Sequence, residues 1–445
     1  MDGSGTHIDF LVASLDRSVA ELRRGVDSLD AVPDLQGTSF PTYVRISIDG
    51  VAGRANDLVE EARRTADPVD HASIATQLRR LHQLVSVLHR QAGLGMGLKT
   101  ESIGLGIVYF VKEAADAIVR GDSQLIIRPD TEHTYSSLGQ HRVFKSVFNS
   151  VRVQPPQGPV PVLIQYPWAE RQSVAVHALF LHELGHEAAQ RDGLTDEVWA
   201  RHPDLPGLDR RFADAIEQIV AGHTAAGRSI SSEEVETSLR TQLDQWVEEL
   251  LCDAIATAYA GPSYLLAFVA FLGSSDHDVW TISHPAFADR VHYTLELADE
   301  LGWAAVLDGK LGEIMQWIRS LAVLSVPAAN DHRGSFVKSV IDELSPGIRG
   351  IAREQVGSSV FTPAAYGSAA DEVEQLVRDG IPPVQLATKH AVGRREMFLG
   401  AWLGKLGHSG ASPDLVPNVA GDMTLQALHG QALELSFLLE DWARP

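Results

Sequence analysis

The chain has 445 residues, a length that suggests two or three packed units, or one catalytic domain with helical extensions. Apolar residues make up 44% and charged residues 21%, which suffices for a large core and argues against wholesale disorder. The formal charge of −21 lacks the basic footprint of nucleic-acid binders, so we expect no nucleic-acid partner and no docking on anionic lipid.

Cysteine content and hydropathy indicate the compartment. The single cysteine, Cys252, excludes an internal disulfide and a cysteine-based zinc cluster, and we interpret it as a buried core residue. The first residues lack the basic region and apolar stretch of a secretory signal. The strongest apolar run, Tyr264–Leu272, is shorter than the about 20 residues that cross a bilayer, and it predicts a buried helix. We therefore expect a cytoplasmic protein without a membrane span.

Two apolar stripes at helical spacing mark the first third of the chain. They consist of Leu15, Val19, Leu22, Val26 and Leu29, and of Ile74, Leu78, Leu81, Val85 and Leu88. Because two such stripes can bury each other, we favour an intramolecular helical bundle over a partner-binding or oligomerising surface. Between them, Asp30–Tyr43 is rich in Pro, Gly and Ser and predicts a loop.

The middle of the chain changes character. Leu125–Arg128 and Val162–Tyr166 are β-prone runs bounded by Pro and Gly, and they predict two short strands. Because prolines flank the second run on both sides, we expect it to lie at the edge of a sheet. After it, Glu170–Arg191 predicts a long helix that stops at Gly193.

Helices continue downstream. A helical stretch is expected around Leu208–Val220. Ser231 and Glu234 form a capping-box pattern, which opens a helix that runs to Ala260, where Gly261-Pro262 ends it.

The last predicted boundaries lie near residue 300. A helix is expected over Phe287–Leu301, with Pro285 near its first turn and Gly302 past its end. From Gly302 onward the sequence reads as helical and carries no motif that indicates chemistry.

One segment carries the chemistry: His182-Glu183-Leu-Gly-His186. Histidines four apart project from one face of a helix and can bind one metal ion. Glu183 lies beside them, where its carboxylate can reach a metal-bound water, as in His-Glu-x-x-His zinc peptidases. Zinc lowers the pKa of its water toward about 7, and the glutamate takes the proton as water attacks a carbonyl.

A zinc site needs more than two protein ligands, and two routes could supply the third. A metzincin-type extension needs glycine where Ala189 stands, so the helix should continue and carry Asp192 away from the metal. Alternatively, Glu249 completes the site, and Asp253 on the same helix face accepts a hydrogen bond from the outer nitrogen of a ligating histidine. Glu248 is a rival ligand. We prefer Glu249, because its pairing with Asp253 supplies that hydrogen-bond partner.

A third element is Ser283-His284-Pro285, followed by Arg290. A histidine or arginine near a zinc site can stabilise the oxyanion of a tetrahedral intermediate. Taken alone, His284 reads as a loop histidine that caps a helix.

The combined pattern resembles the gluzincin metallopeptidases. The pattern consists of His182-Glu-Leu-Gly-His186, Glu249-x-x-x-Asp253, and His284-Pro285 with Arg290. It is most similar to the branch that contains the CAAX prenyl protease and the heat-shock membrane endopeptidase. The resemblance covers roughly residues 160–301, and it departs from that branch because this chain has no membrane-spanning helix.

The resemblance implies a role for each matching residue. One Zn²⁺ ion would be held by His182, His186 and Glu249, with Glu183 as general base and Asp253 as partner of a ligating histidine. His284 and Arg290 would lie beside the substrate carbonyl. In that group an edge strand before the motif helix pairs with an extended substrate, a role that would fall here to Leu163, Ile164 and Gln165.

We therefore expect an α+β fold that is predominantly α-helical. A zincin-like core with a small mixed sheet would occupy 121–301, between an N-terminal helical region (1–120) and a C-terminal helical region (302–445). The predicted function is a zinc metallopeptidase that hydrolyses peptide or protein substrates by attack of a metal-bound water activated by Glu183. The alternative is a catalytically silent or latent zincin-fold protein that serves in binding or signalling, with protein partners on its helical flanks.

Overall fold

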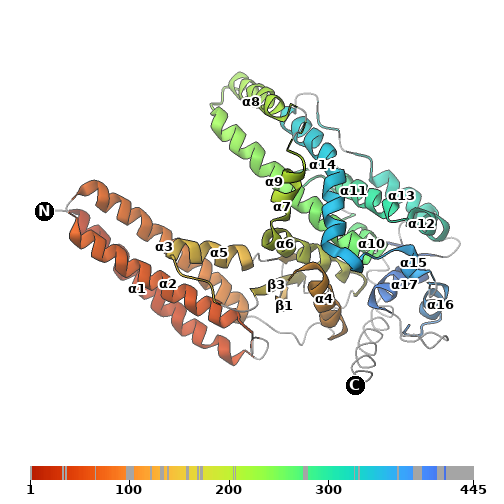
Figure 1. Ribbon diagram of the computed structural model, residues 1–445, viewed down its shortest axis with the longest axis horizontal. Helices are drawn as coiled ribbons and strands as arrows, with labels where there is room; N and C mark the ends of the chain where they lie inside the picture. The colour runs from red at the N-terminus through yellow and green to blue at the C-terminus, as the bar shows by residue number, and fades with distance from the viewer. Residues whose placement is uncertain are drawn as a thin grey trace. The chain divides into compact units, whose positions relative to one another are not determined.

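The computed structural model describes most of the chain (Figure 1). The described residues are 3–32, 35, 38–65, 67–96, 105–120, 123–130, 135–137, 140–156, 160–167, 170, 174–203, 205, 207–273, 279–324, 326–328, 331–367, 370–383, 393–407 and 415–416. The chain divides into two compact units. The first comprises 1–102, 121–130 and 136–166, and the second comprises 103–120, 131–135 and 167–445.

The described residues are mostly helical with one small mixed sheet, which confirms a predominantly helical α+β class. The two units cut the chain differently from the expected regions 1–120, 121–301 and 302–445. Helix α4 (Leu105–Ile118) packs within the second unit against α6 (Phe180–Asp192), whereas the sheet belongs to the first unit. The zincin-like character of the core stays a prediction.

The first unit is a helical bundle. Its helices are α1 (Gly3–Asp27), α2 (Phe40–Arg64), α3 (Pro68–Met96) and α5 (Gln140–Val151). Helices α1, α2 and α3 pack against one another, and α5 packs on α2. Both apolar stripes are buried in one shared core, so the prediction of an intramolecular bundle is confirmed. The burial of these side chains supplies most of the stability of the bundle, because amphipathic helices of this kind are marginal alone.

The predicted loop between the stripes is shorter than expected. A 3-10 turn spans Leu29–Ala31, and α2 already begins at Phe40. Pro41 lies in the first turn of α2, where its missing N–H has no helical partner to lose. The rings of Phe40 and Tyr43 pack against Phe144 of α5. This tertiary packing favours a helix at residues 40–43, where the local composition had favoured a loop.

The sheet contains β1 (Ser123–Asp130), β2 (Ser136–Ser137) and β3 (Val160–Pro167) in the order β1-β3-β2. The expectation that the second strand lies at the edge is therefore wrong, because β3 is the middle strand. Its prolines lie at positions 161 and 167, near the two ends, so 162–166 keep the N–H groups that pair on both sides.

The second unit is built around α9 (Ser232–Ala260), which packs against α6, α8, α10, α11 and α14. Figure 1 shows α9 running alongside α14. The other helices are α7 (Leu194–Arg201), α8 (Leu208–Ala225), α10 (Pro262–Leu272), α11 (Phe287–Glu300), α12 (Ala304–Leu311), α13 (Glu313–Leu321), α14 (His332–Val356), α15 (Pro363–Tyr366), α16 (Ala370–Arg378) and α17 (Arg394–Leu406).

The ends of α9 follow the sequence signals. The hydroxyl of Ser231 accepts a hydrogen bond from the N–H of Glu234, and the Glu234 carboxylate accepts one from the N–H of Ser231. Gly261 ends the helix with φ at 59°, a conformation that favours glycine. The capping box and the stop are therefore confirmed. The run Tyr264–Leu272 forms buried helix α10, and in the described part of the chain no helix is long and apolar enough to cross a membrane.

The helix that carries the histidines starts later than predicted. Residues 171–173 of the predicted helix lie outside the described residues, Val174–Leu179 form a 3-10 helix, and α6 begins at Phe180. Val174 and Val176 are β-branched and have low helix propensity, which agrees with this delay. The stop at Gly193 is confirmed, with φ at 68°.

Candidate metal centre

The candidate centre forms where α6 and α9 approach each other closely. A Cβ added to Gly185 would lie 2.8 Å from Cα and 2.9 Å from Cβ of Cys252. Atoms of two residues do not approach so closely, so the two helices can take this separation only because residue 185 has no side chain. His182 and His186 flank Gly185 on α6, and Glu249 lies almost one turn before Cys252 on α9. The close approach therefore brings both histidines to the glutamate.

Three ligand atoms converge at this contact. The Nε2 atom of His182 lies 3.4 Å from Glu249 Oε2, and the Nε2 atom of His186 lies 3.4 Å from Glu249 Oε1. One ligand atom from each residue lies within 4.8 Å of the other two. Ligand atoms about 2.1 Å from a tetrahedral zinc ion stand about 3.4 Å apart, so these separations suit three corners of one ion.

Both histidines are oriented through their outer nitrogens. Nδ1 of His182 lies 2.8 Å from Oδ1 of Asp253. Nδ1 of His186 lies 2.9 Å from Oε1 of Glu248, which also accepts a hydrogen bond from the Gln190 amide at 3.0 Å. A proton held on Nδ1 leaves the lone pair on Nε2, so each carboxylate aims its imidazole for metal binding.

Asp253 is itself held from two further sides. Nε and Nη2 of Arg290 donate to its two oxygens at 2.8 and 2.7 Å, and the Tyr264 hydroxyl also donates to Oδ1. The Arg290 guanidinium lies 4.7 Å from the ring centroid of Phe268. Arg290 and Asp253 are both buried, and the paired hydrogen bonds between them offset the cost of removing the two charges from water.

The charges at the centre shift the pKa values of its members. Burial alone would lower the pKa of His182, but the carboxylates of Asp253 and Glu249 outweigh it and raise that pKa to about 10. Burial alone would raise the pKa of Glu249, but the hydrogen bond with His182 and the charge of Arg290 lower it to about 2. Burial likewise opposes the ionisation of Asp253, yet Arg290 and His182 hold its pKa below the usual range. Without a metal, the centre is thus a network of paired charges.

His284 lies at the rim of the centre, on the loop of residues 279–286, called here the His284 loop. Its Nε2 atom is 3.5 Å from Oε1 of Glu249, and its side chain is 53% exposed. Nδ1 is 2.8 Å from the Ser283 hydroxyl, and the backbone N–H donates to the Thr281 hydroxyl at 2.9 Å. Burial outweighs the nearby carboxylate and lowers the pKa of His284. A solvent-accessible imidazole therefore lies beside the candidate metal ligands.

The structure brings most of the predicted site residues together. Glu183 is buried on α6 near His186. Burial opposes ionisation of His186, but the hydrogen bond with Glu248, helped by the charges of Glu249 and Glu183, raises the pKa of His186. Arg290 is buried, its guanidinium is bound to Asp253, and Nη1 lies 3.4 Å from Oε2 of Glu249. These contacts favour a positioning role for Arg290 over contact with a substrate carbonyl. Asp192 is bound by the Gln355 amide at 2.7 Å and does not join the ligand group.

The predicted substrate strand belongs to the other unit. Leu163 and Ile164 of β3 are buried, and Gln165 and Ile164 pair with Ser136 and Ser137 of β2. Both neighbours of β3 in the sheet are thus strands of this chain. The role of Leu163, Ile164 and Gln165 in binding substrate stays a prediction.

Two contributors to the centre were not identified from the sequence. Glu248 was considered only as a rival ligand, whereas it accepts a hydrogen bond from His186. The adjacent acidic pair Glu248-Glu249 was the available signal, because consecutive helix residues can reach different neighbours of one site. Tyr264 gave no signal, since its hydroxyl meets Asp253 only through the packing of α10 on α9.

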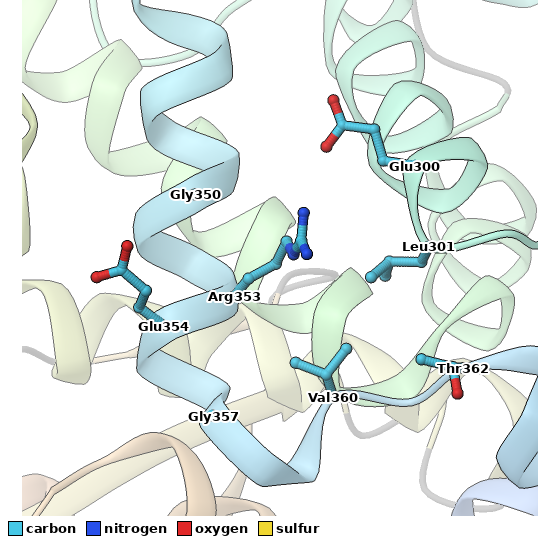
Figure 2. Close-up of a pocket in the computed structure, with 8 residues that line it drawn as sticks. All are labelled: Glu300, Leu301, Gly350, Arg353, Glu354, Gly357, Val360 and Thr362. Carbon is cyan, nitrogen blue, oxygen red and sulfur yellow. The ribbon is translucent and has the colours of Figure 1, made fainter.

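A pocket of about 650 Å³ lies elsewhere in the second unit, at the C-terminal ends of α11 and α14. Figure 2 shows Arg353 extending from α14 toward Glu300 and Leu301, with Glu354 on the other side of the helix. The carboxylate of Glu300 is bound by Arg349, and that of Glu354 by Arg201. None of the metal-centre residues lines this pocket, and its mixed charges favour no particular class of ligand.

Comparisons with protein-family models, with curated proteins and with solved structures find no match for this chain. The function of this chain is therefore inferred from the geometry and chemistry of its own residues.

Proposed function

We propose that the protein is a zinc-dependent metallopeptidase whose metal ligands are His182, His186 and Glu249. The observation that carries this proposal is the convergence of two imidazole nitrogens and one carboxylate at 3.4 Å separations. The orientation of both imidazoles by Asp253 and Glu248 strengthens it, because a carboxylate on the outer nitrogen is typical of zinc-binding histidines.

The residues present fit a zinc ion. Oε2 of Glu249 is buried, and its contacts with Nε2 of His182 and Nη1 of Arg290 are both 3.4 Å long, longer than a normal hydrogen bond. A buried carboxylate oxygen held only by such long contacts is incompletely satisfied, and a bound cation would satisfy it. Two imidazoles and a carboxylate are the ligand set of many catalytic zinc sites, and they disfavour calcium or magnesium, which prefer oxygen ligands alone.

Each residue of the centre has a distinct chemical task. A bound zinc ion would act as a Lewis acid that polarises a carbonyl and acidifies water. A carboxylate oxygen of Glu183 would accept the proton of the attacking water and return it to the departing amine. His284 is accessible and could donate a hydrogen bond from Nε2 to the developing oxyanion. Asp253 and Glu248 hold the imidazoles in place throughout.

The assignment of peptides or proteins as substrates comes from the resemblance to gluzincins. The proposal of a cytoplasmic location, without a nucleic-acid partner, rests on the sequence features described above. Protein partners on the helical flanks belong to the same set of proposals.

The alternative is a zinc protein that is catalytically silent or latent and serves in binding or signalling. A structural zinc site has four protein ligands, whereas a catalytic site keeps one position for water or substrate. Among the described residues, the group that could hold a metal contains three ligands, and no fourth His, Cys, Asp or Glu joins it. This count favours the enzyme over the silent protein.

The decisive variant is Glu183→Gln, which keeps the shape of the side chain and removes its capacity to accept a proton. We expect zinc content to stay at one ion per chain while peptide hydrolysis falls at least about 100-fold. Glu217→Gln, on the exposed face of α8, is the matched control and should change neither quantity. Hydrolysis at the wild-type rate by Glu183→Gln would refute the mechanism.

A further inference from the structure

A groove of about 700 Å³ opens beside the His284 loop in the second unit. Eight of its ten lining residues have apolar side chains, among them Trp280, Leu321, Val323, Leu324, Val326 and Pro327, while polar and apolar atoms share its exposed surface about equally. Volumes of this order are typical of ligand-binding pockets.

Exposed apolar side chains are concentrated in the two segments of the chain that supply residues to this groove. Five large hydrophobic residues are strongly exposed in the described part of the second unit: Val279, Ile282, Val323, Val326 and Ile381. Four of these five lie on the His284 loop or on the segment 321–328 that lines the groove, and Val326 is 90% exposed. Exposed apolar residues concentrated in adjoining segments favour a binding surface over the scattered distribution that needs no explanation.

Packing and a hydrogen bond hold the Trp280 part of the groove in place. The Trp280 ring packs edge-on against Trp246 of α9, with ring centroids 5.5 Å apart. It also lies directly on the backbone of Gly334 at the start of α14, because a Cβ at that position would come 2.3 Å from the ring. The Trp246 indole N–H donates to the Thr281 carbonyl at 3.0 Å and fixes the loop. The Trp280 part of the groove is thus held in place by contacts within the protein.

Two connections join the groove to the metal centre. Trp246 lies one turn before Glu249 on α9, a rise of about 4.5 Å. Trp280 lies four residues before His284, whose Nε2 atom is 3.5 Å from Glu249. Four residues span at most about 14 Å between Cα atoms, so the backbone of Trp280 lies within the reach of about four extended residues from that of His284, beside the metal centre.

The polar groups of the groove indicate an uncharged occupant. Among the described residues that line it, Asp331 is the only ionisable one, and Oδ1 of Asp331 accepts a hydrogen bond from the Gly334 N–H as the cap of α14. That carboxylate is therefore already engaged with the positive end of a helix. A charged side chain in the groove would lose its hydration without gaining a partner.

We propose that this groove binds a bulky apolar side chain, such as leucine or phenylalanine, of an extended peptide substrate. The inference rests on the proposed peptidase function, because it assigns a specificity to that centre. The side chain lies within four residues of the scissile bond. Discrimination between a bulky apolar and an acidic side chain at this position is expected to be about 10- to 100-fold, as for other apolar specificity pockets.

Peptide binding to zinc-loaded Glu183→Gln protein tests this proposal without requiring turnover. Two dye-labelled pools of eight-residue peptides are compared by fluorescence anisotropy, alike except that one carries a single Leu or Phe and the other a single Asp. We expect the apolar pool to bind at least 10-fold more tightly. Adding Val326→Asp should abolish this preference, whereas Ile381→Asp, at an exposed apolar residue outside the groove lining, should preserve it.

The outcomes separate the groove from the peptidase. Equal binding of the two pools, or an unchanged preference in Val326→Asp, would overturn the groove proposal even if the wild type hydrolyses peptides. A preference that depends on Val326, in a protein whose wild type hydrolyses nothing, would support the groove and refute the peptidase. A wild-type dimer that Val326→Asp converts to a monomer would show that a second copy occupies the groove, and this too would overturn the proposal.

Discussion

Gly185→Ala should separate the two helices that form the metal centre. The new Cβ would lie 2.8 Å from Cα of Cys252, whereas non-bonded carbon atoms rest about 3.5–4.0 Å apart. The helices must therefore move by about 0.7–1.2 Å. Metal–ligand distances tolerate only about 0.2 Å, so Glu249 can no longer share an ion with both histidines. We expect zinc affinity to fall by at least about 100-fold.

The same substitution should also destabilise the metal-free protein, because overpacking a tight contact costs about 1–3 kcal/mol. Zinc affinity is measured by competition with a chromophoric chelator, and stability by denaturant unfolding in excess chelator. Gly350→Ala is the matched control: this glycine lies inside α14, and nothing lies within 4 Å of its added Cβ. It should leave zinc affinity unchanged and stabilise the helix by about 0.4–1 kcal/mol.

A double variant tests whether the added methyl group meets the backbone or the side chain of Cys252. The nearest atom to the new methyl group is the backbone Cα of Cys252, and the side-chain atoms lie at 2.9 and 3.2 Å. Adding Cys252→Ala removes only the sulfur, so it should restore little of the lost affinity. If Gly185→Ala alone binds zinc like the wild type, the close approach of α6 and α9 does not build the centre, and the reasoning is refuted.

Further predictions concern the carboxylates and the pH. Asp253→Asn and Glu248→Gln should each weaken zinc binding about 10- to 100-fold by competition titration. Asp253→Asn should also destabilise the protein by about 3–5 kcal/mol in denaturant, because it leaves buried Arg290 without its counter-charge, whereas Glu248 is partly exposed and its loss should affect stability less. Equal destabilisation by the two variants would contradict this. Tyr264→Phe removes one hydrogen-bond donor to Asp253, so it should lower the free energy of unfolding by about 1 kcal/mol and leave zinc binding intact. Complete loss of zinc from this variant would contradict the minor role given to Tyr264. In metal-free protein, the stabilisation by His182 is fully present below pH 6.5 and is lost as pH rises through about 10, because its pKa is raised. The stabilisation by Glu249 is present above pH 4.5 and is lost as pH falls through about 2, because the pKa of Glu249 is lowered. Stability in chelator should therefore be highest between pH 4.5 and 6.5, and a maximum near pH 9 would be inconsistent with these shifts.

The sequence predicted the parts of the fold that depend on local signals. The stop at Gly193, the capping box at Ser231 and the apolar stripes of α1 and α3 each follow from a few neighbouring residues. It also predicted which ligand residues could meet, because the i, i+4 spacing places His182 and His186 on one face.

What the sequence could not give depends on tertiary contacts. Proline content suggested an edge strand, yet a strand position depends on which segments pair with it, and β1 and β2 take both sides of β3. The hydrogen bond from His186 to Glu248 exists only because Gly185 lets α6 approach α9. The engagement of Arg290 with Asp253 likewise requires α11 to pack on α9.

The most direct test of the central claim is anomalous diffraction at the zinc absorption edge from crystals of zinc-loaded protein. We predict one strong anomalous peak about 2.0–2.2 Å from Nε2 of His182, from Nε2 of His186 and from a carboxylate oxygen of Glu249. A peak located elsewhere, or the Glu249 carboxylate turned away from both imidazoles, would contradict the account.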